Sequence, residues 1–413
     1  NAIETVTYTV TATGPGPESC VNAVTQNYVV TVNPPVLQTI TNNDAVVCEG
    51  IATNIAYTTP TAGGTISVQA VYTGGVTGSV GYTASTPIGA SGTITETLNN
   101  PTSIPQTATY TFTATGNGCT PAVSSTVVTV NPTPALTNLP AATTICSSDQ
   151  LNFTPISDVT GTTFTWTSVI SANITGNTNG NSDIRDALVN TGNAIETVTY
   201  TVTATGPGPE SCVNAVTQNY VVTVNPPVTQ SITNNDAVVC EGVATSISYA
   251  TLTQNGDITL TAVYPAGVTG SVNYVGQSIG VSGTIIESLT NNNSTPQIVT
   301  YTFTATGNGC TPVVSSTVVT VNPTPALTNL PAATTICSTD QLNFTPTSDV
   351  TGTTFTWTSV ISANITGNTV GSADIRDALV NTGNAIETVT YTVTATGPGP
   401  ESCVNAVTQN YVV

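Results

Sequence analysis

The chain has 413 residues, of which 38% are hydrophobic and 6% charged, and its net charge is −19 at pH 7. This acidity argues against a nucleic-acid partner, which needs a basic surface, and against electrostatic docking on anionic membranes. The sequence contains no apolar run of about 18 residues, so no membrane insertion is expected in this segment.

Unchanged repetition dominates the chain. The thirty residues at 1–30 recur letter for letter at 193–222 and at 384–413. Such repetition marks a tandem array, and we expect the sequence to be a window cut from a longer one. The phrase VTVNP recurs roughly every 95 residues, the size of one small domain. These intervals predict the C-terminal part of a truncated module at 1–32, then module A at 33–130, module B at 131–224, module A′ at 225–321 and module B′ at 322–413.

The opening phrase has the period of a half-buried strand. In ETVTYTVTAT, the side chains of Val6, Tyr8 and Val10 share one face and the threonines share the other. GPGPES has the composition of a turn, and VTQNYVVTVNP that of the returning strand. In module B, the phrase TTFTWTS places Trp166 inward, where immunoglobulin-like (Ig-like) sandwiches carry a core aromatic residue.

About seven such strands per module predict an all-β fold, a tandem array of Ig-like seven-stranded sandwiches. No stretch has convincing helical periodicity, because SDIRDALVNTG is too short for a stable helix. Prolines in TVNPP and TVNPTP leave little slack at the joints, so we expect an elongated rod. The strands expected in module B are 134–145, 148–156, 162–171, 174–178, 182–190, 195–205 and 214–224.

The nine cysteines follow the rhythm of the modules, one early and one late in each. Regular pairs in β-rich modules predict disulfide bonds and an oxidising, extracellular location. Zinc is disfavoured because the sequence has neither a CxxC pair nor a histidine. The early and late cysteines are Cys48 and Cys119, Cys146 and Cys212, Cys240 and Cys310, and Cys337 and Cys403, and Cys20 is the late cysteine of the truncated module.

Two pairing schemes are open. The simpler one joins the early and late cysteines of one module, as in Cys48 with Cys119. Strand parity favours the other, because it places these two cysteines at opposite ends of a sandwich, about 25–30 Å apart. Cys48 would then bond to Cys212 of the next module. The same scheme pairs Cys146 with Cys310 and Cys240 with Cys403, and leaves Cys20, Cys119 and Cys337 for partners outside the window.

Catalytic and metal chemistry find little support. Without histidine or lysine, histidine-based triads, Schiff bases and phosphate-binding loops are excluded, and no enzyme activity is expected. Asp183 and Asp186 flank Arg185 and are expected on a solvated surface. Asp44 and Glu49 of TNNDAVVCEG are weak candidate ligands for calcium, but turns favour such residues anyway. The prediction is therefore no metal site and no cofactor, with calcium as the alternative.

Three phrases carry a family resemblance: ICSSDQLNFTPISDVTGTTFTWTS, ETVTYTVTATG and the closing VTVNPTP. They resemble the PKD-like or Ig-like repeats of very large Bacteroidota cell-surface adhesins, including SprB-type gliding-motility adhesins exported by type IX secretion. The resemblance extends over the whole chain, although the WDFGDG turn of true PKD domains is absent. It implies PKD-like or Ig-like sandwiches, secretion and a cell-surface location.

The combined interpretation is a structural stalk segment of an extracellular adhesin filament, which extends and presents an adhesive surface. Its partners would be neighbouring repeats of the same polypeptide. Two alternatives stay open. The repeats themselves bind glycan or another cell, with repetition supplying avidity, or the chain is a subunit of a non-covalent pilus or surface lattice, in which hairpin 1–32 completes a neighbour.

Overall fold

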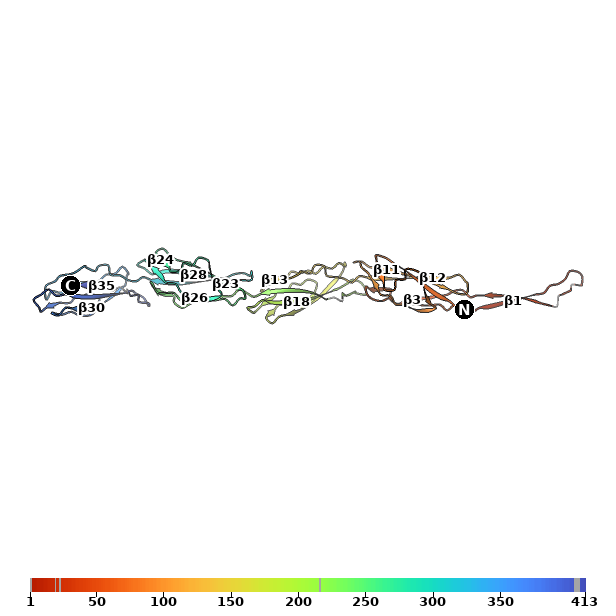
Figure 1. Ribbon diagram of the computed structural model, residues 1–413, viewed down its shortest axis with the longest axis horizontal. Helices are drawn as coiled ribbons and strands as arrows, with labels where there is room; N and C mark the ends of the chain where they lie inside the picture. Colours follow the sequence, from red (N-terminus) through yellow and green to blue (C-terminus); the bar gives the residue numbers. More distant parts are fainter. Residues whose placement is uncertain (1, 19, 22–23, 215–216, 405–408) are drawn as a thin grey trace. The chain divides into compact units, whose positions relative to one another are not determined.

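The computed structural model describes residues 2–18, 20–21, 24–214, 217–404 and 409–413 (Figure 1). These residues form strands, turns and irregular segments and no helix, which confirms the all-β prediction. In this described part, accordingly, no helix is long and apolar enough to cross a bilayer. The chain divides into two compact units, Asn1–Val189 with Thr197–Thr223 and Asn190–Glu196 with Val224–Val413. The expected rod and the module boundaries stay predictions.

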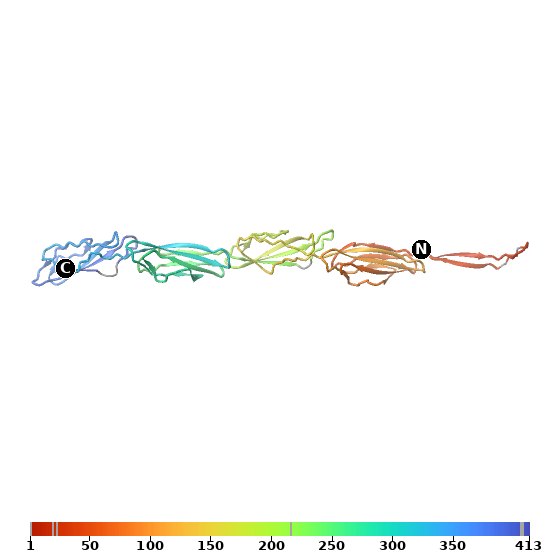
Figure 2. The ribbon, with the colours of Figure 1, turned by 90° about the horizontal axis from the view of Figure 1, so that it is seen from above.

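Module A, in the first unit, is a β-sandwich (Figure 2). A five-stranded sheet in the order β4-β12-β11-β6-β8 faces a three-stranded sheet in the order β3-β5-β9, and β7 pairs with β10. The strands are β3 (Thr39–Asn42), β4 (Val46–Cys48), β5 (Ile55–Thr58), β6 (Thr65–Tyr72), β7 (Thr77–Gly78), β8 (Thr86–Gly89), β9 (Ser91–Ile94), β10 (Leu98–Asn99), β11 (Gln106–Thr115) and β12 (Ala122–Asn131).

The core of module A follows from alternation. In β11, Ala108, Tyr110 and Phe112 are fully buried, whereas the threonines between them are only partly buried. These side chains form one apolar cluster with Ile55 of β5 and Ile94 of β9. Each buried aromatic side chain removes about 150–250 Å² from water, at about 25 cal/mol per Å². Burial of this face therefore holds the two sheets together.

More strands form in module A than the expected seven, and one of the additional strands arises because the first segment changes sheets. The Asn42 side chain donates from Nδ2 to the Val127 carbonyl at 3.0 Å, and its Oδ1 accepts from the Asp44 N–H at 3.2 Å. At this turn the chain leaves β3, which pairs with β5, and enters β4, which runs parallel to β12. One expected strand is thus two short strands in different sheets.

Module B has a sheet in the order β13-β19-β18-β14-β16 and a pair of strands, β15 with β17. The expected strands 134–145 and 148–156 are largely wrong. Only residues 143–145 of the first lie in a strand, and the second makes isolated bridges, such as Phe153 with Ile184. Prolines interrupt both segments and have no N–H to donate to a ladder. The strands are β13 (Thr143–Cys146), β14 (Thr163–Ile170), β15 (Ile174–Thr175), β16 (Gly180–Asn181), β17 (Val189–Asn190), β18 (Glu196–Thr205) and β19 (Gln218–Asn225).

Residues 1–32, which we call the leading hairpin, contain only β1 (Glu4–Val10) and β2 (Gln26–Val32). The two strands pair antiparallel with Tyr8 opposite Tyr28. Figure 1 shows a two-stranded ribbon, and all of β1 and nearly all of β2 are exposed. The predicted hairpin forms, and none of the sheets among the described residues covers its apolar face.

The second unit repeats the pattern. Module A′ has sheets β21-β29-β28-β23-β25, β20-β22-β26 and β24-β27, and module B′ has sheets β32-β30-β34-β35 and β31-β33. Trp357 of β30 is 6% exposed and its counterpart Trp166 is 5% exposed, as predicted for a core aromatic residue. The strands are β20 (Ser231–Asn234), β21 (Val238–Cys240), β22 (Ile247–Ala250), β23 (Gly256–Val263), β24 (Val268–Gly270), β25 (Gln277–Gly280), β26 (Ser282–Ile285), β27 (Leu289–Asn291), β28 (Gln297–Gly307), β29 (Val313–Asn322), β30 (Thr354–Ile361), β31 (Ile365–Thr366), β32 (Gly371–Ser372), β33 (Val380–Asn381), β34 (Val389–Thr396) and β35 (Gln409–Val412).

Candidate functional site: a disulfide-bonded joint between modules

The early cysteine of module A lies at the downstream end of its sandwich. Strand β4 runs parallel to the last strand, β12, with Cys48 opposite Asn131. The N–H of Glu49 donates to the Asn131 carbonyl at 2.9 Å, so the ladder continues one residue past the cysteine. Because β12 leads directly into module B, this pairing fixes Cys48 beside the joint.

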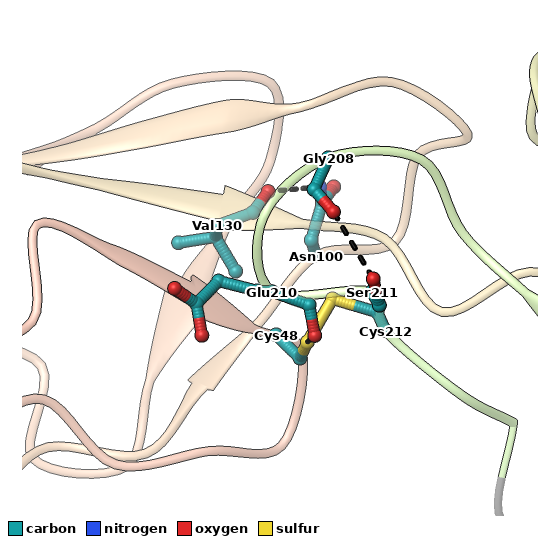
Figure 3. The surroundings of a disulfide bond; sticks show 7 residues. All are labelled: Cys48, Asn100, Val130, Gly208, Glu210, Ser211 and Cys212. Carbon is teal, nitrogen blue, oxygen red and sulfur yellow. Dashed lines mark hydrogen bonds between the residues drawn. A yellow bond between two sulfur atoms is a disulfide. The ribbon is translucent and has the colours of Figure 1, made fainter.

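The late cysteine of module B lies in the turn between β18 and β19, at the upstream end of its sandwich. Gly208 has a φ of 97°, which favours glycine, and Ser211 donates from its N–H and its Oγ to the Gly208 carbonyl. The N–H of Gly206 donates to the Cys212 carbonyl at 2.8 Å. The phrase GPGPES thus folds on itself and presents Cys212 toward module A (Figure 3).

A disulfide joins these two positions. The Cα atoms of Cys48 and Cys212 are 5.5 Å apart, within the range that a disulfide needs. Figure 3 shows the bond beside the end of β12, where Asn100 donates to the Val130 carbonyl at 2.9 Å. The pairing across the joint, which strand parity favoured, is therefore present, and the pairing of Cys48 with Cys119 is wrong.

The second unit contains the same joint. Cys240 lies opposite Asn322 at the end of β21, and its Cα atom is 5.5 Å from that of Cys403, to which it is bonded. Cys146 and Cys310 are also disulfide-bonded, but their expected pairing with each other stays a prediction because they lie in different units. The remaining cysteines, Cys20, Cys119 and Cys337, are free thiols.

The candidate calcium ligands do not come together. Asp44 precedes β4 and Glu49 follows it, so a whole strand separates them. Glu49 instead shares a surface hollow at the joint with Asp158 of module B. Asp158 already accepts a hydrogen bond from the Ala135 N–H at 2.8 Å. Among the described residues, no three Asp, Glu, Cys or His side chains lie close enough to hold a metal ion.

Each module also buries one carboxylate, which we did not expect from the sequence. In module A, Glu96 is fully buried and accepts hydrogen bonds from the hydroxyls of Tyr72 at 2.9 Å and Tyr110 at 2.5 Å. The N–H of Gly81 donates to the same carboxylate at 2.7 Å. A buried carboxylate is tolerated only with such partners. The signal was present in TITETL, where Glu96 has the same parity as buried Ile94 and Leu98.

Module B uses Asp186 in the same way, which corrects its expected solvated position. Asp186 is 7% exposed and accepts hydrogen bonds from the Tyr200 hydroxyl at 2.7 Å and from the Thr178 N–H at 2.8 Å. Asp183 does lie at the surface, paired with Arg185 at 2.9 Å. The hydrogen bond that Arg185 donates to Asp183 holds the pKa of Asp183 below its usual value. Glu287 and Asp377 repeat the buried arrangement in A′ and B′.

The tyrosines that contact these carboxylates are held in their neutral form. Burial, followed by the hydrogen bond to Glu96, raises the pKa of Tyr110 well above its ordinary value. The same two causes, with Asp186 as partner, raise the pKa of Tyr200. The cluster is therefore a donor–acceptor network inside the core.

Comparison with known proteins adds a family match for part of the chain. Residues 143–228 and 334–413, which lie mainly in modules B and B′, match the model of the PKD-like domain. No curated protein matches the chain.

Solved structures with similar folds include cadherin and Ig arrays. The protocadherin gamma B2 cadherin domains 1–5 are 11% identical, with 98% of this chain and 86% of that chain covered and a TM-score of 0.31. The human desmocollin-1 ectodomain is 9% identical, with 98% of this chain and 85% of that chain covered and a TM-score of 0.22. Titin domains I67–I69 are 10% identical, with 70% of this chain and 98% of that chain covered and a TM-score of 0.39. Identities and scores this low carry no argument about function.

Proposed function

We propose that this chain is a structural stalk segment of an extracellular, cell-surface adhesin, and that it transmits tension along its modules. The observation that carries the proposal is the disulfide across the joint of each A–B pair, Cys48 with Cys212 and Cys240 with Cys403. A bond between two separately folded sandwiches adds nothing to either core. It resists their separation.

The position of the bonds decides where tension runs. A pull on the two ends of the chain enters through the residues before Cys48, crosses the sulfur–sulfur bond and continues after Cys212. The 164 residues of sequence separation between these cysteines are bypassed, and the second bond bypasses a further separation of 163. These two bonds therefore shield most of both modules in each pair from a stretching force.

Single-molecule stretching tests this proposal. Each disulfide prevents about 550 Å of chain from extending under force, at about 3.4 Å per residue. We expect the oxidised chain to be about 1,100 Å shorter at full extension than the fully reduced chain. A Cys20→Ser chain, which lacks only a free thiol, is the control and should match the oxidised length. Equal extension of oxidised and reduced chains would contradict the proposal.

The finer identity of the adhesin rests on the resemblance of the repeats. The PKD-like match of modules B and B′ supports a repeat of the kind found in Bacteroidota surface adhesins, including the gliding-motility type. Disulfide bonds support an extracellular location. We propose no enzymatic role, and we propose neighbouring repeats of the same polypeptide as the main partners. The length of the natural polypeptide on a denaturing gel tests this, because a stalk belongs to a far larger chain.

A further inference from the structure

A disulfide that carries tension divides module A into a loaded part and a shielded part. A pull that crosses the disulfide at Cys48 runs through residues 33–48, which we call the loaded segment of module A. This segment passes from one end of its sandwich to the other. Asn33 donates to the Asn117 carbonyl, in the turn between β11 and β12, at 2.7 Å, whereas Cys48 lies beside the joint. Tension therefore acts along the segment and shears it against the rest of the module.

Backbone pairing attaches only part of the loaded segment. Strand β3 pairs with β5 of the three-stranded sheet, and β4 pairs with Thr129–Asn131 at the end of β12. Among the described residues, no strand of the segment pairs with the earlier part of β12. The connection to that part of the five-stranded sheet is made by side chains.

Gln38 supplies most of this connection. Its Nε2 lies within hydrogen-bonding distance of three acceptors on β11 and β12. These are the Phe112 carbonyl at 3.1 Å, the Ala122 carbonyl at 3.0 Å and the Ser124 Oγ at 3.0 Å. One carboxamide thus attaches the upstream half of the loaded segment to the five-stranded sheet, while β3 attaches the segment to the other sheet.

Module A′ has the same contact. Its loaded segment is residues 225–240, which end at the disulfide of Cys240. The Nε2 of Gln230 lies 3.0 Å from the Val313 carbonyl and 2.9 Å from the Ser315 Oγ. The contact therefore occurs in both modules whose first segment is loaded through a disulfide.

Modules B and B′ carry their glutamine on the last strand, which is the part that the disulfide loads there. In module B, Gln218 of β19 accepts a hydrogen bond from the Leu136 N–H at 2.8 Å. In module B′, Gln409 of β35 accepts one from the Leu327 N–H, also at 2.8 Å. Both leucines belong to shielded residues. In all four modules, a glutamine of the loaded part is thus bonded to the shielded part.

Stability alone does not account for the glutamines of modules A and A′. The Oε1 atoms of Gln38 and Gln230 are buried, and no described residue donates to them. A buried acceptor without a donor lowers stability, and an apolar side chain would avoid this loss. We propose, on the basis of the proposed function, that Gln38 and Gln230 hold the loaded segments on their sandwiches and set the force at which these segments detach.

The test is stretching of the oxidised 413-residue chain at constant force. Detachment of a loaded segment gives a short step, because a segment of this length extends to at most about 55 Å. The variant combines Gln38→Leu with Gln230→Leu, which keeps most of the bulk of each side chain and removes the donor. We expect its short steps to occur on the order of 10-fold sooner than those of the native chain.

A matched control separates this effect from ordinary destabilisation. Val68 and Leu260 are fully buried at equivalent positions of the shielded strands β6 and β23. The combination of Val68→Ala with Leu260→Ala should lower the unfolding temperature at least as far as the glutamine variant does, because each change leaves a cavity. It should nevertheless leave the timing of the short steps unchanged. Equally early steps in this control would overturn the proposal.

The same recordings keep this proposal distinct from the proposed function. A length difference of about 1,100 Å between oxidised and reduced chains, together with early steps in the glutamine variant, supports both. The same length difference with native step timing in the glutamine variant would overturn the role of Gln38 and Gln230 and leave the stalk. No length difference would overturn both, because a chain whose disulfides carry no tension has no loaded segment.

Discussion

Residues 1–30 and 193–222 have the same sequence and different surroundings. Both form an antiparallel hairpin, but Tyr8 is 55% exposed and Tyr200 is fully buried. Val6 and its counterpart Val198 differ in the same way, at 43% and 0%. Alternation and a Gly-Pro turn are therefore sufficient to define the hairpin, whereas burial depends on a second sheet that these thirty residues do not contain.

The largest expected difference is between Tyr200→Ala and Tyr8→Ala. Loss of the buried ring should destabilise module B by about 3–5 kcal/mol, which corresponds to a fall of roughly 15–30 °C in its unfolding temperature. Tyr8→Ala is the matched control, and its exposed ring should change stability by less than about 0.5 kcal/mol. Calorimetry of both variants measures this. Equal effects would show that the leading hairpin is packed in solution.

A smaller difference is expected between Glu96→Gln and Glu4→Gln. The amide keeps one oxygen but places donor hydrogens where the hydroxyls of Tyr72 and Tyr110 also donate. Unfilled hydrogen bonds in a core should cost module A about 1–3 kcal/mol. Glu4 lies on an exposed strand of the leading hairpin, so its substitution should be neutral. A stable Glu96→Gln module would refute the role given to this carboxylate.

Alkaline pH should lower the free energy of unfolding of modules A and B to different extents. An unfolded tyrosine has a pKa of about 10, whereas burial raises the pKa of Tyr110 in the folded module. Above pH 10 the unfolded chain therefore releases protons that the folded chain keeps, and stability falls as pH rises. The free energy of unfolding should fall by about 1.4 kcal/mol per pH unit for each such tyrosine.

Module A should lose stability more steeply than module B in this range. The pKa values of Tyr57, Tyr72, Tyr82 and Tyr110 are raised in module A, and that of Tyr200 is raised in module B. Calorimetry between pH 8 and pH 11 compares the two transitions. If the unfolding temperatures of both modules fell equally, or began to fall well below about pH 9, the attribution of this effect to the buried tyrosines would be contradicted.

The smallest expected effect is that of salt and chelator. The two ion pairs among the described residues, Arg185 with Asp183 and Arg376 with Asp374, are both at the surface. Such pairs contribute about 0–1 kcal/mol, so unfolding temperatures should shift by only about 2 °C between low and molar NaCl. EDTA should have no effect. A large fall with EDTA that Glu49→Gln abolishes would instead place a cation at the joint, beside Asp158.

The alternation of apolar and polar residues predicted those strands whose formation depends on residues close in the sequence. Alternation identified β11, β18 and the inward position of Trp166, because a strand buries every second side chain. It failed for residues 134–156, where prolines withhold the N–H groups that a ladder needs. The parity of Glu96 and Asp186, each on the apolar face of its segment, also indicates their burial, but Asp186 was interpreted as a surface group and Glu96 was not singled out.

By itself the sequence determined the all-β architecture, the repeat and the hairpins, because these follow from periods of two residues and from turn chemistry at fixed positions. It left two cysteine pairings open. The tertiary structure decided between them by placing Cys48 at the end of a strand parallel to β12, next to the joint, and Cys119 in a turn at the far end of the same module. Tertiary structure alone also distinguished Tyr8 from Tyr200, because burial depends on residues distant in the chain, and identical letters cannot encode that difference.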